Sequence, residues 1–171
     1  HLLRKFSKIT NIPVTTTIHS MGAFDETNEL SLEFLGMHGN PSANYAVMDS
    51  DLIIGIGTRF DDRITGNISK FAPKAYKAYK EKKGGIIHVN INEKEINHVL
   101  SSHYNFNMDS KIFFERTIPY LKKTKNDKWI DTINNWKKKY PFKYTRTDKI
   151  KTQEVIIELN NYLLDNKINN Y

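Results

Sequence analysis

Cysteine is absent from the 171 residues, which excludes disulfides, thiolate metal sites and cysteine nucleophiles. Long apolar runs are also missing. No segment reaches the ~20 apolar residues that cross a bilayer, so we expect no membrane partner. The first residues lack the apolar core of a secretory signal. Because position 1 is His rather than Met, we expect a piece of a longer protein.

Acidic residues are outnumbered: 26 Lys and Arg stand against 19 Asp and Glu, giving a net charge of +7. Clustered basic residues bind nucleic acids through the phosphates. Here the excess is mainly lysine in short runs, and neither an aromatic RNA-binding motif nor a helix-turn-helix pattern accompanies it. We interpret the charge as solvated surface and expect no nucleic-acid partner. A stand-alone basic nucleotide- or RNA-binding module is the alternative.

Short β-branched or apolar segments alternate with helical ones. The pattern predicts strands at 12–17, 51–57 and 85–91, with an edge strand at 104–107. It predicts helices from Leu2 to Asn11, from Ser42, at 93–100, 111–123 and 126–140, and from Thr152. We interpret 58–83 as an irregular, strand-rich crossover. The alternation predicts an α/β fold with a doubly wound, mainly parallel sheet.

The chain length suits one main domain with additions. We predict a main domain at 1–125, a helix and connector at 126–150, and the beginning of a further domain at 151–171. The last helix has nothing to pack against within the sequence, which is why we assign it to another domain.

Polar residues follow three of the predicted strands, at 17–19, 57–63 and 90–91. In a doubly wound sheet the carboxyl ends of parallel strands share one edge, so these segments should meet at one crevice.

The segment GIGTRFDDRITG, residues 55–66, is the most informative motif. Its first two glycines permit a tight turn and a close approach of a ligand to the backbone. Phe60 stands where a dinucleotide fingerprint requires a third glycine, so a standard NAD site is not predicted. Arg59 and Arg63 carry donor forks suited to a phosphate or a flavin carbonyl.

Asp61 and Asp62 lie between these arginines, and such carboxylates form ion pairs more readily than metal sites. A salt-bridged loop that only covers the sheet is the alternative. The histidines show no metal-ligand spacing, and no catalytic triad is present. The residues by themselves therefore predict a nucleotide-type crevice without catalytic residues and without a metal site.

Six segments at matching spacing resemble the central domain of the acetolactate synthase (acetohydroxyacid synthase) family of thiamine diphosphate enzymes. They are IPVTTT at 12–17, LGMHG at 35–39, ANYAV at 43–47, DLII at 51–54, RFDDRITGN at 59–67 and GIIH at 85–88. The resemblance runs to about Ile157, and 72–83 and 129–140 look like the fungal form. Another thiamine enzyme whose middle domain binds ADP or FAD, such as an oxalyl-CoA decarboxylase or a glyoxylate carboligase, is the alternative within this superfamily.

The resemblance implies an enzyme that condenses two pyruvates, or pyruvate with 2-oxobutyrate, with loss of CO2 in branched-chain amino-acid synthesis. It implies thiamine diphosphate, Mg²⁺ and an FAD that performs no net redox chemistry. It also implies a homodimer or larger assembly, a possible regulatory subunit and, for a fungal form, a mitochondrial location, with plastid or cytoplasm as alternatives.

By the resemblance, 1–125 is the FAD-binding central domain without its first strand, and 151–171 begins the thiamine diphosphate domain. The residues implied to bind FAD are Thr17, Ile18, His19, Met37, His38, Gly39, Gly57, Arg59, Asp61, Arg63, Ile64, Asn90, Ile91 and Asp109. Asp62 and Arg63 are implied to border the substrate channel, where inhibitors of the family bind.

Three positions depart from the family pattern: His19, Asn90 and Met108 replace a usual Gln, an acidic residue and a Gly. The family's catalytic glutamate and its Gly-Asp-Gly metal motif are not in the sequence. We therefore predict that this chain is not catalytic alone and binds FAD poorly or not at all.

Overall fold

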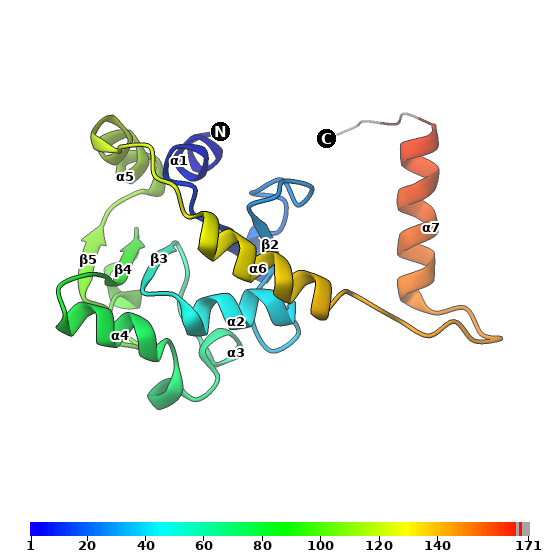
Figure 1. Cartoon of the computed structure of the whole chain (residues 1–171), viewed down its shortest axis with the longest axis horizontal. Coiled ribbons are helices and arrows are strands. Elements are labelled where there is room, and N and C mark those ends of the chain that lie inside the picture. Colours follow the sequence, from blue (N-terminus) through cyan, green and yellow to red (C-terminus); the bar gives the residue numbers. More distant parts are fainter. Residues whose placement is uncertain (167, 169–171) are drawn as a thin grey trace. The chain divides into compact units, whose positions relative to one another are not determined.

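The computed structural model describes residues 1–166 and 168 (Figure 1). The predicted segment 151–171 is therefore described except at 167 and 169–171. The chain forms two compact units, divided between Tyr140 and Pro141, and each is considered by itself.

The first unit alternates helices with short strands in the order that the sequence predicts for an α/β fold. Its elements are α1 (Leu2–Thr10), β1 (Val14–Thr16), β2 (Ser31–Phe34), α2 (Pro41–Asp49), β3 (Leu52–Ile56), α3 (Asp62–Thr65), α4 (Pro73–Lys80), β4 (Gly85–Asn90), β5 (Tyr104–Asn107), α5 (Ser110–Thr117) and α6 (Asp127–Lys139).

All strand pairs are parallel, and they form two small sheets. β1 pairs with β2, and β3, β4 and β5 form the second sheet in that order. The two faces of β4 are covered by different helices: Ile86 packs toward α4 with Phe71 and Ala75, while Val89 packs toward α1 and α5. Helices on both faces of a parallel sheet confirm the predicted doubly wound fold.

β3 is an edge strand, although its sequence predicts a strand inside the sheet. Gly57 N donates to Val89 O at 2.8 Å. Because backbone groups alternate sides along a strand, those of Leu52, Ile54 and Ile56 point away from β4. Leu52 is 36% exposed, so the strand is less buried than predicted.

β1 has a free edge as well, and it lines the same space as the free edge of β3. The two strands border one hollow of about 420 Å³, together with apolar side chains such as Phe6, Ala46 and Val47. Unpaired backbone groups at an apolar hollow are costly unless another chain segment pairs with them. Each of the two sheets therefore has a free edge at this hollow.

Four local predictions differ from the structure. Residues 31–34 form β2, which was not predicted as a strand. The prediction of a strand-rich crossover at 58–83 is wrong, because residues 73–80 form the helix α4. The predicted helix at 93–100 is only a turn, Glu93–Glu95, and α5 ends at Thr117 rather than near 123.

α6 packs on the first unit, as predicted for a helix laid over the main domain. Its Ile133 is buried with Leu32, Leu35, Ala43 and Ala46. A division at residue 125 would separate this helix from its own hydrophobic cluster.

The second unit contains α7 (Thr152–Asp165), none of whose residues is buried. Arg146 forms ion pairs with Glu154 (3.3 Å) and Glu158 (3.2 Å) on this helix. Among the described residues, no helix has the length and apolar composition that would span a membrane.

Candidate functional site

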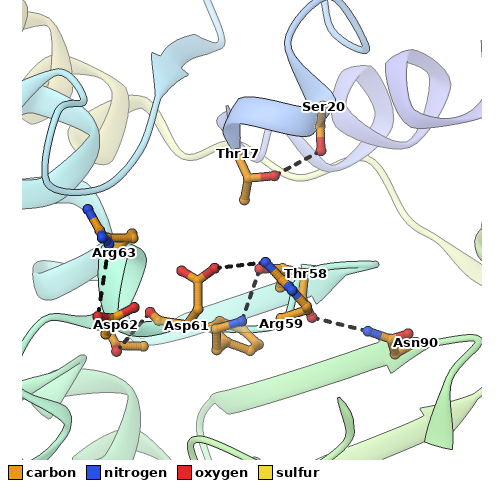
Figure 2. A network of polar contacts seen from close by, with 10 residues as sticks. Thr17, Ser20, Thr58, Arg59, Asp61, Asp62, Arg63 and Asn90 are labelled. Carbon is orange, nitrogen blue, oxygen red and sulfur yellow. Dashed lines mark hydrogen bonds and ion pairs between the residues drawn. The ribbon is translucent and has the colours of Figure 1, made fainter. Parts of the chain in front are cut away.

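The loop after β3 is fixed to the neighbouring strand through one carbonyl group (Figure 2). Thr58 O accepts hydrogen bonds from His88 Nε2 at 2.8 Å and from Asn90 Nδ2 at 3.2 Å. His88 and Asn90 are two residues apart on β4, so their side chains leave the same face of the strand.

Phe60 anchors the same loop in the core. It is 4% exposed, and its ring meets His88 edge-on at 5.0 Å and Phe71 at 6.2 Å between centroids. Its φ is 52°, in the left-handed region that non-glycine residues rarely adopt. The position that a dinucleotide fingerprint gives to glycine thus has a glycine-like backbone here with an aromatic side chain.

Gly55 makes room for that ring. A Cβ built at Gly55 would lie 2.3 Å from Phe60 Cζ. Gly57 differs, because its φ of 66° lies next to open space, with no atom within 4 Å of a Cβ position. The backbone at Gly57 is therefore accessible to a ligand.

The charged side chains of the loop pair with one another at its surface. Arg59 Nη2 lies 3.3 Å from Asp61 Oδ2, and Arg63 Nε lies 3.9 Å from Asp62 Oδ2. Such solvent-exposed pairs contribute little to stability, about 0 to 1 kcal/mol each. The guanidinium of Arg59 is therefore available to a stronger anion.

Asp61 also has a buried oxygen without a donor. Its Oδ1 has no hydrogen-bond partner within the part of the chain that the structure describes. A buried acceptor without a donor is uncommon and costly in a native protein. A hydroxyl or N–H group of a bound ligand would satisfy it.

The end of β1 faces this loop across the crevice, as the sequence predicts (Figure 2). The hydroxyls of Thr17 and Ser20 lie 3.0 Å apart, and both residues line the 420 Å³ hollow together with Thr58. The carboxyl ends of β1 and β3 therefore contribute to one polar rim, and the end of β4 is connected to it through the bond from Asn90 to Thr58 O.

A second hollow, of about 330 Å³, adjoins the first. Met37, Asp62 and Arg63 line it, and Met37 N donates to Arg63 O at 2.8 Å. Ile64 lines both hollows. The structure thus brings the two predicted substrate-channel residues next to Met37.

The other predicted residues occupy more varied places. Ile18 is 64% and Ile91 72% exposed, and His19 and His38 are exposed as well. Gly39 is half-buried in the turn before α2, where its amide donates to Gly36 O at 2.9 Å.

Asn90 and Asp109 use their side chains within the protein. Asn90 Oδ1 accepts from Asn92 N at 3.0 Å, so both ends of its amide are engaged. Asp109 Oδ1 accepts from Lys111 N at 2.7 Å as the cap of α5. Within the described ranges, no group of three or more His, Asp or Glu side chains could hold a metal ion.

His88, Phe60 and Ser20 belong to the site but were not predicted. For His88 a signal was present: its spacing of two from Asn90 places both on one face of a strand that ends at the crevice. For Phe60 the signal was its position in the motif where glycine is expected.

Parallel strands with helices on both faces define the class of doubly wound α/β domains. The chain belongs to the family described as thiamine pyrophosphate enzyme, central domain, whose model matches residues 1–117.

Curated relatives of the chain carry one activity in their names. The chain is 45% identical over 162 residues to the mitochondrial acetolactate synthase catalytic subunit of Saccharomyces cerevisiae, and the matched region covers 92% of this chain and 24% of that protein. It is 43% identical over 172 residues to the mitochondrial acetolactate synthase of Schizosaccharomyces pombe, with 97% and 26% covered.

A plant relative is more distant. The chloroplastic acetolactate synthase 1 of Zea mays is 37% identical over 161 residues, covering 90% of this chain and 24% of that protein. The chain thus spans about a quarter of the length of the curated relatives it matches. These comparisons confirm the predicted resemblance.

Proposed function

We propose that this chain is the FAD-binding central part of an acetolactate synthase catalytic subunit. The observation that carries the proposal is the rim at which Thr17, Ser20 and Thr58 meet, with Arg59 and the unpartnered Asp61 Oδ1 beside it. Similarity to acetolactate synthases over more than nine-tenths of the chain supports it.

The residues at this rim suit the parts of FAD. Arg59 would hold the diphosphate, since a guanidinium fork matches phosphate oxygens, and Gly57, which has open space where a side chain would stand, would let the diphosphate approach the main chain. Asp61 Oδ1 and the Thr17 hydroxyl would meet polar groups of the flavin or its ribityl chain. The bound FAD would act as a structural group without net redox chemistry.

Nine further residues are proposed to take part in flavin binding on the basis of the resemblance: Ile18, His19, Met37, His38, Gly39, Arg63, Ile64, Ile91 and Asp109. Asn90 is the weakest of the set, because its amide is already paired at both ends. Asp62 and Arg63 are proposed to border the substrate channel, together with Met37 of the 330 Å³ hollow.

The activity belongs to the whole protein under this proposal. It would condense two pyruvates, or pyruvate with 2-oxobutyrate, using thiamine diphosphate and Mg²⁺ held by residues outside this chain. Assembly as a homodimer or larger, a regulatory subunit and a mitochondrial location are proposed with it, because relatives are named as catalytic subunits and as mitochondrial.

A further strand between β1 and β3 is part of the proposal. It would pair with the free backbone groups of Ile54 and Ile56 and fill the apolar 420 Å³ hollow. Without this strand, the sheet beside the proposed flavin site is incomplete. This is why we propose that the 171 residues alone bind FAD poorly or not at all.

Two experiments test the proposal. The natural gene is sequenced on both sides of this segment, where we expect a downstream Gly-Asp-Gly segment followed by an Asn, which can share Mg²⁺ with a diphosphate. The full-length protein is then assayed for acetolactate formation from pyruvate. A full-length protein that lacks this motif and forms no acetolactate would contradict the assignment.

A further inference from the structure

The carbonyl of Thr58 accepts two side-chain hydrogen bonds, from His88 and from Asn90. A backbone carbonyl has two acceptor positions, and here side chains of the adjacent strand occupy both. Because the peptide group is planar, fixing this oxygen also fixes the amide nitrogen of Arg59. The two bonds therefore determine where the chain enters the Arg59–Asp61 segment.

His88 can make its bond in only one tautomer. A carbonyl oxygen accepts and cannot donate, so the proton must be on Nε2. Nδ1 is buried and has no hydrogen-bond partner in the described part of the structure, which matches a neutral ring with no proton there. The side chain is 1% exposed, so solvent does not compete for either nitrogen.

The ring of His88 also supports Phe60, whose left-handed backbone requires an external restraint. One side chain thus holds the carbonyl before Arg59 and packs on the aromatic ring after it. Asp61, with its buried oxygen, follows directly.

We propose that His88 is a positioning residue for the anion-binding loop. As a neutral Nε2–H tautomer, it holds Thr58 O and the Phe60 ring so that Arg59 and Asp61 are set in place before a ligand binds. The inference rests on the proposed FAD site for its ligand, but the positioning itself is a property of the loop.

A second histidine gives a matched control. His103 Nδ1 accepts from the amide of Ile86 at 2.8 Å, so it also bonds to backbone groups of this sheet. It does so near the amino end of β4, away from the rim. Loss of His103 should lower stability without changing the Arg59 loop.

The first test uses the full-length natural protein without added FAD and does not depend on a ligand. The ring ¹⁵N shifts of His88 should show a protonated Nε2 and an unprotonated Nδ1 in the wild type. Hydrogen exchange is then measured at the amides of Ile64 and Thr65, which donate to Asp61 O at 3.0 and 2.9 Å. His88→Leu should accelerate this exchange by about tenfold or more, the effect of one lost hydrogen bond.

His88→Gln separates the hydrogen bond from the ring. Its amide nitrogen can reach the place of Nε2, so exchange should stay within about threefold of wild type. His103→Leu should change the exchange rates of Ile64 and Thr65 only as much as it changes the rate of global unfolding. A proton on Nδ1, or equal exchange in His88→Leu and wild type, would overturn the proposal. The tautomer measurement decides it even if His88→Leu does not fold.

The second test measures FAD affinity in the full-length natural protein. We expect His88→Leu to weaken binding by about tenfold or more and His88→Gln by less than about threefold. His103→Leu should bind as wild type does. If the wild type does not bind FAD, the proposed function fails while the exchange results still decide the role of His88. Equal loss of affinity in His88→Leu and His103→Leu would show a merely structural role and overturn the inference.

Discussion

The ring of Phe60 meets the imidazole of His88 edge-on, with 5.0 Å between their centroids and 80° between their planes. Through this contact the loop that carries Arg59 is fixed to the most buried strand of the unit, β4. The hydrogen bonds from His88 and Asn90 to Thr58 O hold the same loop. The rigidity of the rim therefore comes from these bonds and from its aromatic residue, and not from its exposed ion pairs.

Removal of the Phe60 ring should be among the most destabilising substitutions in the first unit. We expect Phe60→Ala to cost about 3 to 5 kcal/mol, because the ring is buried against Phe71 and His88. Phe60→Gly should be the more stable of the two variants by about 1 kcal/mol, since glycine accepts the left-handed backbone. Urea unfolding of both variants measures the difference, and a less stable Phe60→Gly would show that the backbone is not left-handed in solution.

Gly55 and Phe60 should be coupled energetically. The methyl of Gly55→Ala would collide with the ring, which we expect to cost about 1 to 3 kcal/mol. In the Phe60→Ala background the closest contact is gone and only Thr58 Cγ2, 2.9 Å from the Cβ position, must shift. The double variant should therefore recover at least about 1 kcal/mol in a double-mutant cycle.

Gly57→Ala is the control for this cycle, since it strains the backbone without touching the ring. Its cost of about 1 to 2 kcal/mol should be the same in both backgrounds. Additive costs for Gly55→Ala and Phe60→Ala would contradict the packing described here.

His103 should make the stability of the first unit depend on pH. Burial lowers the pKa of His103 below its ordinary value, and its Nδ1 accepts from Ile86 N. The unfolded chain therefore binds more protons than the folded one in this range. The contribution of neutral His103 to the free energy of unfolding is fully present above about pH 6.5, the ordinary pKa of histidine. It is lost as the pH falls toward the pKa of His103 in the folded state.

The measurement is the free energy of unfolding between about pH 7 and pH 5 in wild type and His103→Leu. The variant should be less stable at the upper end and should show a smaller decrease over the range. Equal slopes in the two proteins would mean that His103 does not contribute.

α6 should behave as part of the first unit. Ile133→Ala should lower the stability of this unit by about 2 to 5 kcal/mol, because the side chain is buried with Leu32, Leu35 and Ala46. Leu159→Ala on α7 is the matched control, since that side chain is exposed. Thermal unfolding should shift only for Ile133→Ala, and equal shifts would place α6 outside the unit.

The sequence was sufficient where hydrophobic patterns are strong. The doubly wound class, the strand at 104–107 and the approach of the β1 and β3 ends follow from apolar runs and parallel topology. Ile91, at the end of β4, lines neither hollow. β2 was missed because it is short and carries Glu33, whose φ of 58° interrupts the strand pattern. α4 was missed because only the small Ala75 and Ala78 are buried, on a helix otherwise rich in lysine.

Helix ends depended on single residues. The predicted helix at 93–100 is broken by Asn97, whose φ is 59°. α5 ends at Thr117 and passes into a tighter turn at Ile118–Tyr120, because Pro119 has no N–H to continue the helical hydrogen bonds. The geometry of the site was the least accessible to sequence reasoning. The bonds from His88 and Asn90 to Thr58 link residues 30 and 32 positions apart, and no local pattern encodes them.

The central claim is that the loop beginning at Gly57 holds the diphosphate of FAD through Arg59. Its most direct test is the FAD dissociation constant of the full-length natural protein, measured for wild type, Arg59→Ala and Arg63→Ala. We predict that the wild type binds FAD and that Arg59→Ala weakens binding at least about tenfold, the effect of one charge-assisted hydrogen-bonded pair. Arg63→Ala, at the second hollow, should weaken it less. Unchanged affinity in Arg59→Ala would contradict the account.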